Sequence, residues 1–158
     1  MNDARRIGLI SDTHGLLRPE AVEALRGSEL ILHAGDVGKP EILEELGKIA
    51  PVIAIRGNVD TASWCLALKE TEFVETSAAR FYLLHNLRDL DLNPAAAGIQ
   101  LVLSGHTHQP KQFQKDGVLY INPGSAGPRR FNVPISLARL DLSITPWKVE
   151  FVEVRHST

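Results

Sequence analysis

The stretch Gln100-Leu101-Val102-Leu103-Ser104-Gly105-His106-Thr107-His108 is the part of the sequence that best indicates the fold. Its apolar run is typical of a short buried strand, and Gly105 lets the backbone turn sharply where the strand ends. Two imidazoles one residue apart can face a single point only if something occupies it, and a metal ion suits imidazole nitrogens best. Taken alone, the pair is equally consistent with a polar turn beside the core.

Four other apolar runs end in the same way. Each is followed by an aspartate, an asparagine or a histidine, all of which ligate metals. Runs 7–11, 30–34, 52–56 and 81–84 lead into Asp12 with His14, Asp36, Asn58 and His85, respectively. Five strand ends therefore carry candidate metal ligands.

The first third of the chain alternates predicted strands with short helices. Pro19 and Pro40 stand where helices begin, because the fixed φ of proline suits the first helical turn. This alternation is typical of βαβ units and a mainly parallel sheet, whose ligands bind at the carboxyl ends of the strands. The predicted elements are strands 6–11, 30–33 and 52–55 and helices 19–26 and 40–49.

The pattern changes after Asp60. Paired β-type runs indicate hairpins, and Asp116-Gly117 suits a tight primed turn. We therefore expect parallel α/β structure first and antiparallel β structure later, as two sheets packed face to face in one domain of residues 1–158. The predicted segments are a helical turn or two at 61–68, strands 70–76, 79–84 and 100–103, a loop with a short helix at 86–98, and hairpins 111–121 and 135–154.

The composition excludes several classes of protein. Hydrophobic residues make up 44% and charged residues 23% of the 158 residues, which rules out disordered and collagen-like chains. The net charge of −2 gives no overall attraction for nucleic acid or an anionic membrane. Cys65 is the only cysteine, and no apolar run approaches the roughly 18 residues that span a bilayer. We expect a soluble cytoplasmic protein without a signal peptide.

The number and kind of the candidate ligands favour two metal ions. One structural zinc takes four ligands and prefers cysteine, so the set is too large for such a site. Two ions about 4 Å apart stabilise the attacking and leaving oxygens of an in-line displacement, which is the chemistry of phosphate ester hydrolysis. The candidates are Asp12, His14, Asp36, Asn58, His85, His106 and His108.

In this order the motifs resemble the signature of the calcineurin-like metallophosphoesterases. Ser11-Asp12-Thr13-His14-Gly15, His33-Ala34-Gly35-Asp36-Val37, Arg56-Gly57-Asn58-Val59-Asp60, His85, Gly105-His106-Thr107-His108 and Asn122-Pro123-Gly124-Ser125 are similar to the small bacterial and archaeal phosphodiesterases of that superfamily. The resemblance covers about residues 6–125. It implies an α/β fold, a four-layer α/β/β/α sandwich of two packed mixed sheets.

The resemblance also implies roles for the ligands. Asp36 would bridge the ions, with Asp12, His14 and His108 on one and Asn58, His85 and His106 on the other. Manganese is the expected metal, and nickel, iron or zinc also fit a mixed imidazole and carboxylate site. The hypothesis is attack on a small phosphodiester by a metal-bridging hydroxide, with Asp36, Asn58 and His106 as the central residues.

Two positions depart from the family pattern. Val59 stands where the wider superfamily has a histidine that assists the leaving group, which lowers the expectation of monoesterase activity and leaves the leaving-group acid unassigned. Asn86 replaces a common glycine, and asparagine tolerates the left-handed backbone that glycine adopts. The nearby Asp60 is interpreted as a cap of the following helix.

Several other residues have two readings. His33 is favoured as a buried hydrogen-bonded residue over a metal ligand. The turn at 122–125 would cradle a phosphate or brace the His106 loop. Arg129 and Arg130 would hold a phosphate or lie in solvent, and Trp64 and Trp147 would stack a base or, preferably, pack.

Two other functions compete with hydrolysis. The same fold serves as a retromer subunit that binds protein partners, although that relative lacks the full ligand set present here. A nucleotide-binding switch is the other, but Gly35-Asp36-Val37-Gly38-Lys39-Pro40 lacks the Ser or Thr and the glycine spacing of a phosphate loop. The expected partner is a small phosphorylated substrate, and strand edge 111–121 would allow a homo-oligomer.

Overall fold

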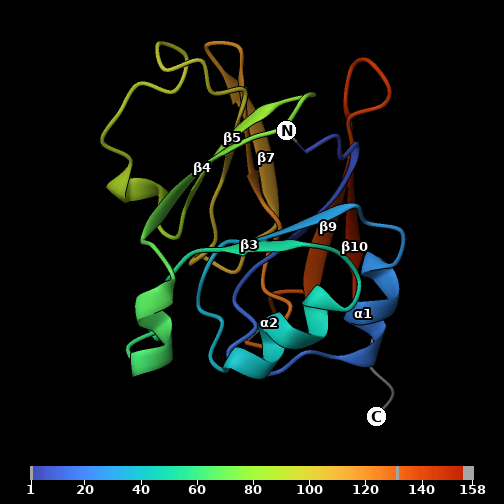
Figure 1. Cartoon of the computed structure of the whole chain (residues 1–158), viewed down its shortest axis with the longest axis vertical. Coiled ribbons are helices and arrows are strands. Elements are labelled where there is room, and N and C mark those ends of the chain that lie inside the picture. The colour runs from blue at the N-terminus through green and yellow to red at the C-terminus, as the bar shows by residue number, and fades with distance from the viewer. Residues whose placement is uncertain (1, 131, 155–158) are drawn as a thin grey trace.

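Two mixed five-stranded sheets form the centre of the structure, a computed structural model that describes residues 2–130 and 132–154 (Figure 1). The strand order is β10-β9-β1-β2-β3 in the first sheet and β4-β5-β6-β8-β7 in the second. The inward side chains of both sheets share one core, which includes Leu9, Leu32, Phe81 and Leu103. The predicted face-to-face pair of sheets is confirmed.

The first sheet is built on the predicted βαβ units. Its strands β1 (Arg6–Ile10), β2 (Leu30–His33) and β3 (Val52–Ala54) are parallel. The helices α1 (Pro19–Leu25) and α2 (Pro40–Gly47) begin at their prolines and cover its outer face, where Leu25 and Leu46 pack against Ile10 and Ile31. Apolar residues of β1 alternate between this helical layer and the inter-sheet core, as the period of a strand requires.

The second sheet contains most of the later strands. They are β4 (Thr71–Glu75), β5 (Arg80–Leu84), β6 (Leu101–Leu103), β7 (Lys111–Lys115) and β8 (Val118–Asn122). The β7–β8 turn has positive φ at Asp116 (53°) and Gly117 (78°), which is the geometry of the predicted primed turn. The pairs β5–β6 and β6–β8 are parallel, so the later sheet is mixed and not purely antiparallel.

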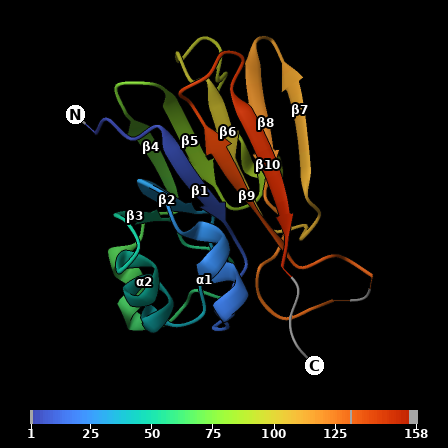
Figure 2. The same ribbon diagram turned by 90° about the vertical axis from the view of Figure 1, so that its right-hand side faces the viewer.

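The assignment of each half of the chain to one sheet is wrong. The hairpin of β9 (Ser136–Asp141) and β10 (Lys148–Glu153) joins the first sheet, where β9 lies antiparallel to β1 with Leu9 opposite Ala138 (Figure 2). Pairing there satisfies the outer backbone groups of β1 and places Leu140 in the inter-sheet core. The last strands therefore complete the sheet that the first strand begins.

The outer face of the second sheet carries the fourth layer. The loop 86–99, with the 3-10 helix η2 (Leu87–Asp89), lays Leu87, Leu90 and Leu92 over Tyr82 and Tyr120. This layer is a loop with one short helix. The apolar outer face of the second sheet is small, so three leucines are enough to cover it. A second 3-10 helix, η1 (Ser63–Ala67), occupies the predicted helical turns at 61–68. Within the described residues, no helix is long and apolar enough to cross a membrane.

Candidate metal centre

The candidate ligands follow the carboxyl ends of five strands. Asp12 and His14 follow β1, Asp36 follows β2, Asn58 follows β3, His85 follows β5, and His106 and His108 follow β6. Five of these residues have positive φ: Asp12 (55°), His14 (47°), Asp36 (57°), His106 (72°) and His108 (65°). Residues other than glycine rarely have a positive φ, and those that do cluster at functional sites. The strand ends are therefore shaped to present side chains.

One group of potential ligands consists of Asp12, His14 and His108. The Oδ1 atom of Asp12 lies 3.2 Å from His108 Nε2 and 3.7 Å from His14 Nε2. Asp12 is fully buried, and its other oxygen, Oδ2, accepts hydrogen bonds from the Ser11 hydroxyl at 2.6 Å and the His106 amide at 3.1 Å. These bonds hold Oδ2 and leave Oδ1 facing the two imidazoles.

A second group consists of Asp12, Asp36 and His85. The Oδ2 atom of Asp36 lies 3.1 Å from His85 Nε2 and 3.5 Å from His14 Nε2. Its Oδ1 atom accepts a hydrogen bond from the Val59 amide at 2.9 Å. One oxygen of Asp36 thus faces an imidazole from each group, while Asp12 is common to both groups.

The remaining two candidates lie at the edge of the centre. The rings of His106 and His85 meet edge to face, with centroids 5.3 Å apart, and His106 is solvent-exposed. Asn58 is also exposed and lines a cavity of about 810 Å³ together with His85. Both therefore face the open side, where a substrate would arrive.

Glycines allow the loops to approach this closely. A Cβ on Gly57 would collide with the carboxylate and backbone of Asp36, and a Cβ on Gly105 would collide with Ser11 Oγ and Asp12 Oδ2. At both positions a side chain would displace a carboxylate of the centre. The glycines that precede Asn58 and His106 in the motifs thus have a steric role.

The electrostatic environment keeps Asp12 ionised. Burial raises the pKa of its carboxyl, but the imidazoles of His108 and His14 and the hydroxyl of Ser11 lower it by more. The net pKa lies well below the ordinary value for aspartate. At neutral pH, Asp12 is a buried anion.

Asp36 and His85 influence each other in the same way. Burial raises the pKa of Asp36, but His85 and the Val59 amide lower it to below its ordinary value. Burial lowers the pKa of His85, but the carboxylates of Asp36 and Asp12 raise it by more. The negative charge of the two carboxylates thus favours positive charge beside them, either on the imidazole rings or as a bound cation.

Buried polar atoms in this cluster fit bound cations. Within the described part of the chain, Asp12 Oδ1, His14 Nε2 and His85 Nε2 are buried without a hydrogen-bond partner. The Nδ1 atom of His85 lies 2.7 Å from the carbonyl oxygen of Ala34, which can only accept, so Nδ1 carries the proton. In the neutral ring, Nε2 then turns a lone pair toward Asp36. Two lone pairs that face each other in a buried site call for a positive charge between them.

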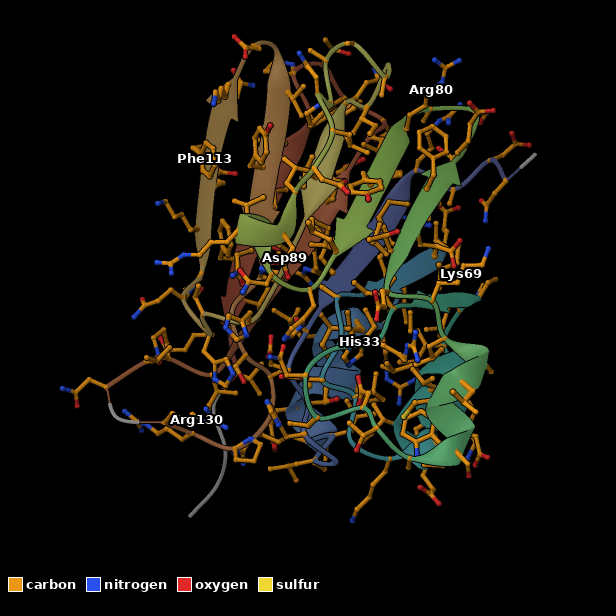
Figure 3. The ribbon with its side chains drawn as sticks, turned by 90° about the vertical axis from the view of Figure 1, so that its left-hand side faces the viewer. His33, Lys69, Arg80, Asp89, Phe113 and Arg130 are labelled. Atoms are coloured by element: carbon orange, nitrogen blue, oxygen red, sulfur yellow. The ribbon has the colours of Figure 1, made fainter. Side chains whose placement is uncertain are left out.

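His33 lies beneath the centre and is hydrogen-bonded, as expected. It is fully buried, its Nδ1 accepts from the Gly35 amide at 3.1 Å, and its Nε2 lies 3.0 Å from Thr13 Oγ1. Since the Thr13 hydroxyl donates to the Val37 carbonyl at 2.8 Å, it accepts the Nε2 proton of a neutral ring. Burial lowers the pKa of His33 to about 4, which keeps the ring neutral. Figure 3 shows His33 among the loops at the strand ends.

Asp60 has a role that differs from the predicted helix cap. The 3-10 helix η1 begins after Ala62 without a side-chain cap. The buried carboxylate of Asp60 accepts three backbone hydrogen bonds, from Val37 at 3.1 Å, Gly38 at 3.0 Å and Gly57 at 2.9 Å. It therefore ties the loop that carries Asp36 to the loop that carries Asn58. The sequence gives no spacing signal for the bonds to Val37 and Gly38, because these partners lie more than twenty residues away.

The turn at 122–125 braces the histidine loop. Asn122 Nδ2 donates to the Gly105 carbonyl at 2.9 Å and to Thr107 Oγ1 at 3.0 Å, and Ser125 Oγ donates to the Asp12 carbonyl at 2.9 Å. Of the two readings of this turn, the bracing role is the one that these contacts support.

The other residues singled out in the sequence have structural positions. Asn86 has a φ of −112° and caps η2 by accepting from the Arg88 amide, so its tolerance of a left-handed backbone is not used here. Trp64 and Trp147 pack against the cores. Arg129 and Arg130 are exposed, and Figure 3 shows Arg130 on a projecting loop.

Comparisons with known proteins agree with this geometry. The family model of the calcineurin-like phosphoesterase superfamily domain matches residues 6–144. The chain belongs to this superfamily. A probable metallophosphoesterase of Methanothermobacter thermautotrophicus is 38% identical over 85% of this chain and 86% of its own. A phosphodiesterase of Methanocaldococcus jannaschii is 30% identical over 75% of this chain and 82% of its own.

Solved structures show the same fold. A novel archaeal phosphodiesterase superposes with a TM-score of 0.78 and 25% identity over 93% of this chain and 99% of its own. Vps29 from Entamoeba histolytica, solved in complex with zinc, superposes with a TM-score of 0.70 and 21% identity over 95% of this chain and 99% of its own. The second likeness concerns the fold alone. Together with the clustered ligands, superfamily membership makes this protein a metal-dependent phosphoesterase.

Proposed function

We propose that this protein is a phosphodiesterase that hydrolyses a small phosphodiester with two divalent cations. The observation that carries the proposal is the set of buried atoms without hydrogen-bond partners, Asp12 Oδ1, His14 Nε2 and His85 Nε2, among the described residues. Superfamily membership and the phosphodiesterase relatives support the same reaction. The proposed ligands are Asp12, His14, Asp36, Asn58, His85, His106 and His108.

The ligands are divided between two sites in this proposal. Asp12, His14 and His108 hold one cation, and Asn58, His85 and His106 hold the other. Asp36 serves both, which is supported by the position of its Oδ2 atom near His14 and His85. The chemistry that such a pair supplies when bound is Lewis acidity, which activates water and neutralises negative charge on the phosphoryl group.

The side chains of this protein orient both the centre and the substrate. The Val59 amide fixes one oxygen of Asp36, so that the other is directed at the imidazoles. In this proposal Asn58 and His106, both exposed, complete the second cation site on the side from which the substrate enters. Val59 itself is 48% exposed and carries no polar group, so it neither protonates a leaving group nor stabilises the second charge of a monoester. A diester with its single negative charge fits this site better.

The finer assignments follow from ligand chemistry. The proposed metal is manganese, with nickel, iron and zinc as alternatives, because a site of mixed imidazole and carboxylate ligands does not select sharply among these ions. The substrate is a small phosphorylated molecule. The protein acts in the cytoplasm, and the exposed strand β7 offers an edge at which a second copy could pair.

Turnover is the measurement that tests this proposal. Protein stripped with a chelator and reloaded with manganese is expected to hydrolyse bis-p-nitrophenyl phosphate, and Asp36→Asn is expected to lose at least about a hundredfold in kcat/KM because both cations lose a ligand. Asp116→Asn, on the remote hairpin turn, is the matched control and keeps full activity. Unchanged turnover and metal content in Asp36→Asn would contradict the assignment.

The same experiment separates an enzyme from a protein-binding scaffold. Since a Vps29 was solved with zinc, metal content alone does not distinguish the two. A manganese-loaded protein without turnover on phosphodiesters would favour the scaffold.

A further inference from the structure

Two cavities meet at the candidate metal centre, and they differ in charge. The cavity of about 810 Å³ contains His85, and a second cavity of about 560 Å³ contains His106. Because the rings of these histidines are 5.3 Å apart, a phosphodiester bound between them would direct one ester arm into each cavity. The lining residues then decide which arm enters which cavity.

The larger cavity, on the His85 side, is acidic. Its lining includes the carboxylates of Glu70, Asp89 and Asp91, with Arg56 as its only cation. Such a wall repels an arm that carries further negative charge. It suits a neutral, hydroxyl-bearing arm, since carboxylates accept hydrogen bonds from hydroxyl groups.

The smaller cavity, on the His106 side, has the opposite character. Arg88 and Lys111 are among its lining residues, and no aspartate or glutamate is. Its walls also carry an aromatic pair, Phe113 and Tyr120, whose rings are stacked with centroids 4.7 Å apart and planes inclined by 4°. Leu87 of η2 also lines this cavity. Figure 3 shows Phe113 on β7 at the face of the molecule that also carries Asp89.

Phe113 is the only apolar residue of β7, and part of its ring is exposed. All five residues of β7 are exposed, and the other four are Lys111, Gln112, Gln114 and Lys115, as is typical of an edge strand protected from aggregation. Phe113 stacks on Tyr120 across the β7–β8 pair, and the 36% of its surface that stays exposed is free to contact a ligand. The ammonium of Lys111 lies 5.4 Å from the centre of its ring. An aromatic group next to a cation is the combination that recognises a nucleobase and its phosphates.

We infer that the cavity of Phe113, Tyr120, Leu87, Arg88 and Lys111 binds the nucleoside arm of the substrate, so that the substrate class is a nucleotidyl phosphodiester. This inference rests on the proposed function. The base contacts the aromatic wall, the scissile phosphate lies at His106, and any further phosphate on that arm meets Arg88 and Lys111. The other ester arm enters the acidic cavity.

Direct binding tests the aromatic wall. In calorimetric titration of the manganese-loaded protein, AMP is expected to bind at least about tenfold more tightly than ribose 5-phosphate, which has the same sugar and phosphate but no base. Phe113→Leu keeps an apolar residue but removes the flat ring, and it is expected to weaken AMP binding by about five- to hundredfold without affecting ribose 5-phosphate. The control is Phe73→Ala, at a phenylalanine 49% exposed on the opposite edge strand β4, and it leaves both affinities unchanged.

The cationic side is tested with ADP. Lys111→Gln is expected to weaken ADP binding several-fold more than AMP binding at low salt, whereas Lys115→Gln, on the same strand outside the cavity lining, changes neither. Equal binding of AMP and ribose 5-phosphate by the unmodified protein, or AMP binding unaffected by Phe113→Leu, overturns the inference.

Failure of this inference is distinguishable from failure of the proposed function. Turnover of bis-p-nitrophenyl phosphate without any preference for AMP would leave the phosphodiesterase intact and remove the nucleotide site. A preference for AMP that depends on Phe113, without turnover of any diester, would keep the site and remove the hydrolase.

Discussion

Replacing Asp60 with asparagine should destabilise the two loops that carry the candidate ligands Asp36 and Asn58. The carboxylate of Asp60 holds Val37 and Gly57 through Oδ2 and Gly38 through Oδ1. If the amide oxygen of asparagine takes the place of Oδ2, its NH₂ group faces the Gly38 amide, and two donors then oppose each other in a buried site. A lost hydrogen bond to a charged group costs about 1.5–3 kcal/mol, and the two retained bonds weaken because their acceptor is neutral. The expected loss in the free energy of unfolding is about 3 kcal/mol.

Urea unfolding of the metal-free protein at neutral pH measures this loss. Asp116→Asn is the matched control, because asparagine suits the primed turn there, and it should stay within about 0.5 kcal/mol of the unmodified protein. Asp60→Asn should also bind manganese about 10- to 100-fold more weakly, since the loops of Asp36 and Asn58 are no longer held together. If Asp60→Asn matched the unmodified protein in both stability and manganese affinity, the three hydrogen bonds would not be what positions these loops.

Two further predictions concern buried residues near the centre. His33 has a pKa of about 4 in the folded protein and about 6.5 when unfolded, so its contribution to stability is complete above pH 6.5 and is lost as the pH falls toward 4. The difference in unfolding free energy between the unmodified protein and His33→Gln, both metal-free, should therefore shrink by about 2–3 kcal/mol from pH 7 to pH 4.5; a difference that does not vary with pH would refute a neutral buried ring. Gly105→Ala should lose about 1–3 kcal/mol in thermal or urea unfolding, because its Cβ collides with the carboxylate of Asp12, whereas Gly47→Ala, which has open space in α2, should be neutral or stabilising. Equal stability of the two alanine variants would count against the steric argument.

Much of the candidate site could be predicted because its signals are local. Each candidate ligand lies within four residues of the end of an apolar run, and the carboxyl ends of parallel strands are the usual place for a ligand in an α/β fold. The structure brings Asp12, His14, Asp36, His85 and His108 together, with His106 beside His85, and their roles as metal ligands stay predictions. Asn58 lines the cavity that contains His85, and its role as a ligand stays a prediction.

The supporting residues were harder to predict because their contacts are distant in sequence. An aspartate before a helical turn is commonly a helix cap, yet the carboxylate of Asp60 binds the backbone of two loops. Ser125 and Asn122 brace loops whose residues lie 15 or more positions away. The charge difference between the two cavities is likewise invisible in a sequence with a net charge of −2, because it depends on which loops face each other.

The sequence by itself determined the short-range features of this protein: the helices that begin at Pro19 and Pro40, the turn at Asp116-Gly117, and the candidate ligands at the strand ends. These depend on backbone preferences and side-chain periodicity, which act over a few residues. Only the tertiary structure decided that β9 pairs with β1 and that Asp60 joins two loops. Strands pair through backbone groups that are the same in every residue, so the partner of a strand is chosen by the packing of the whole core.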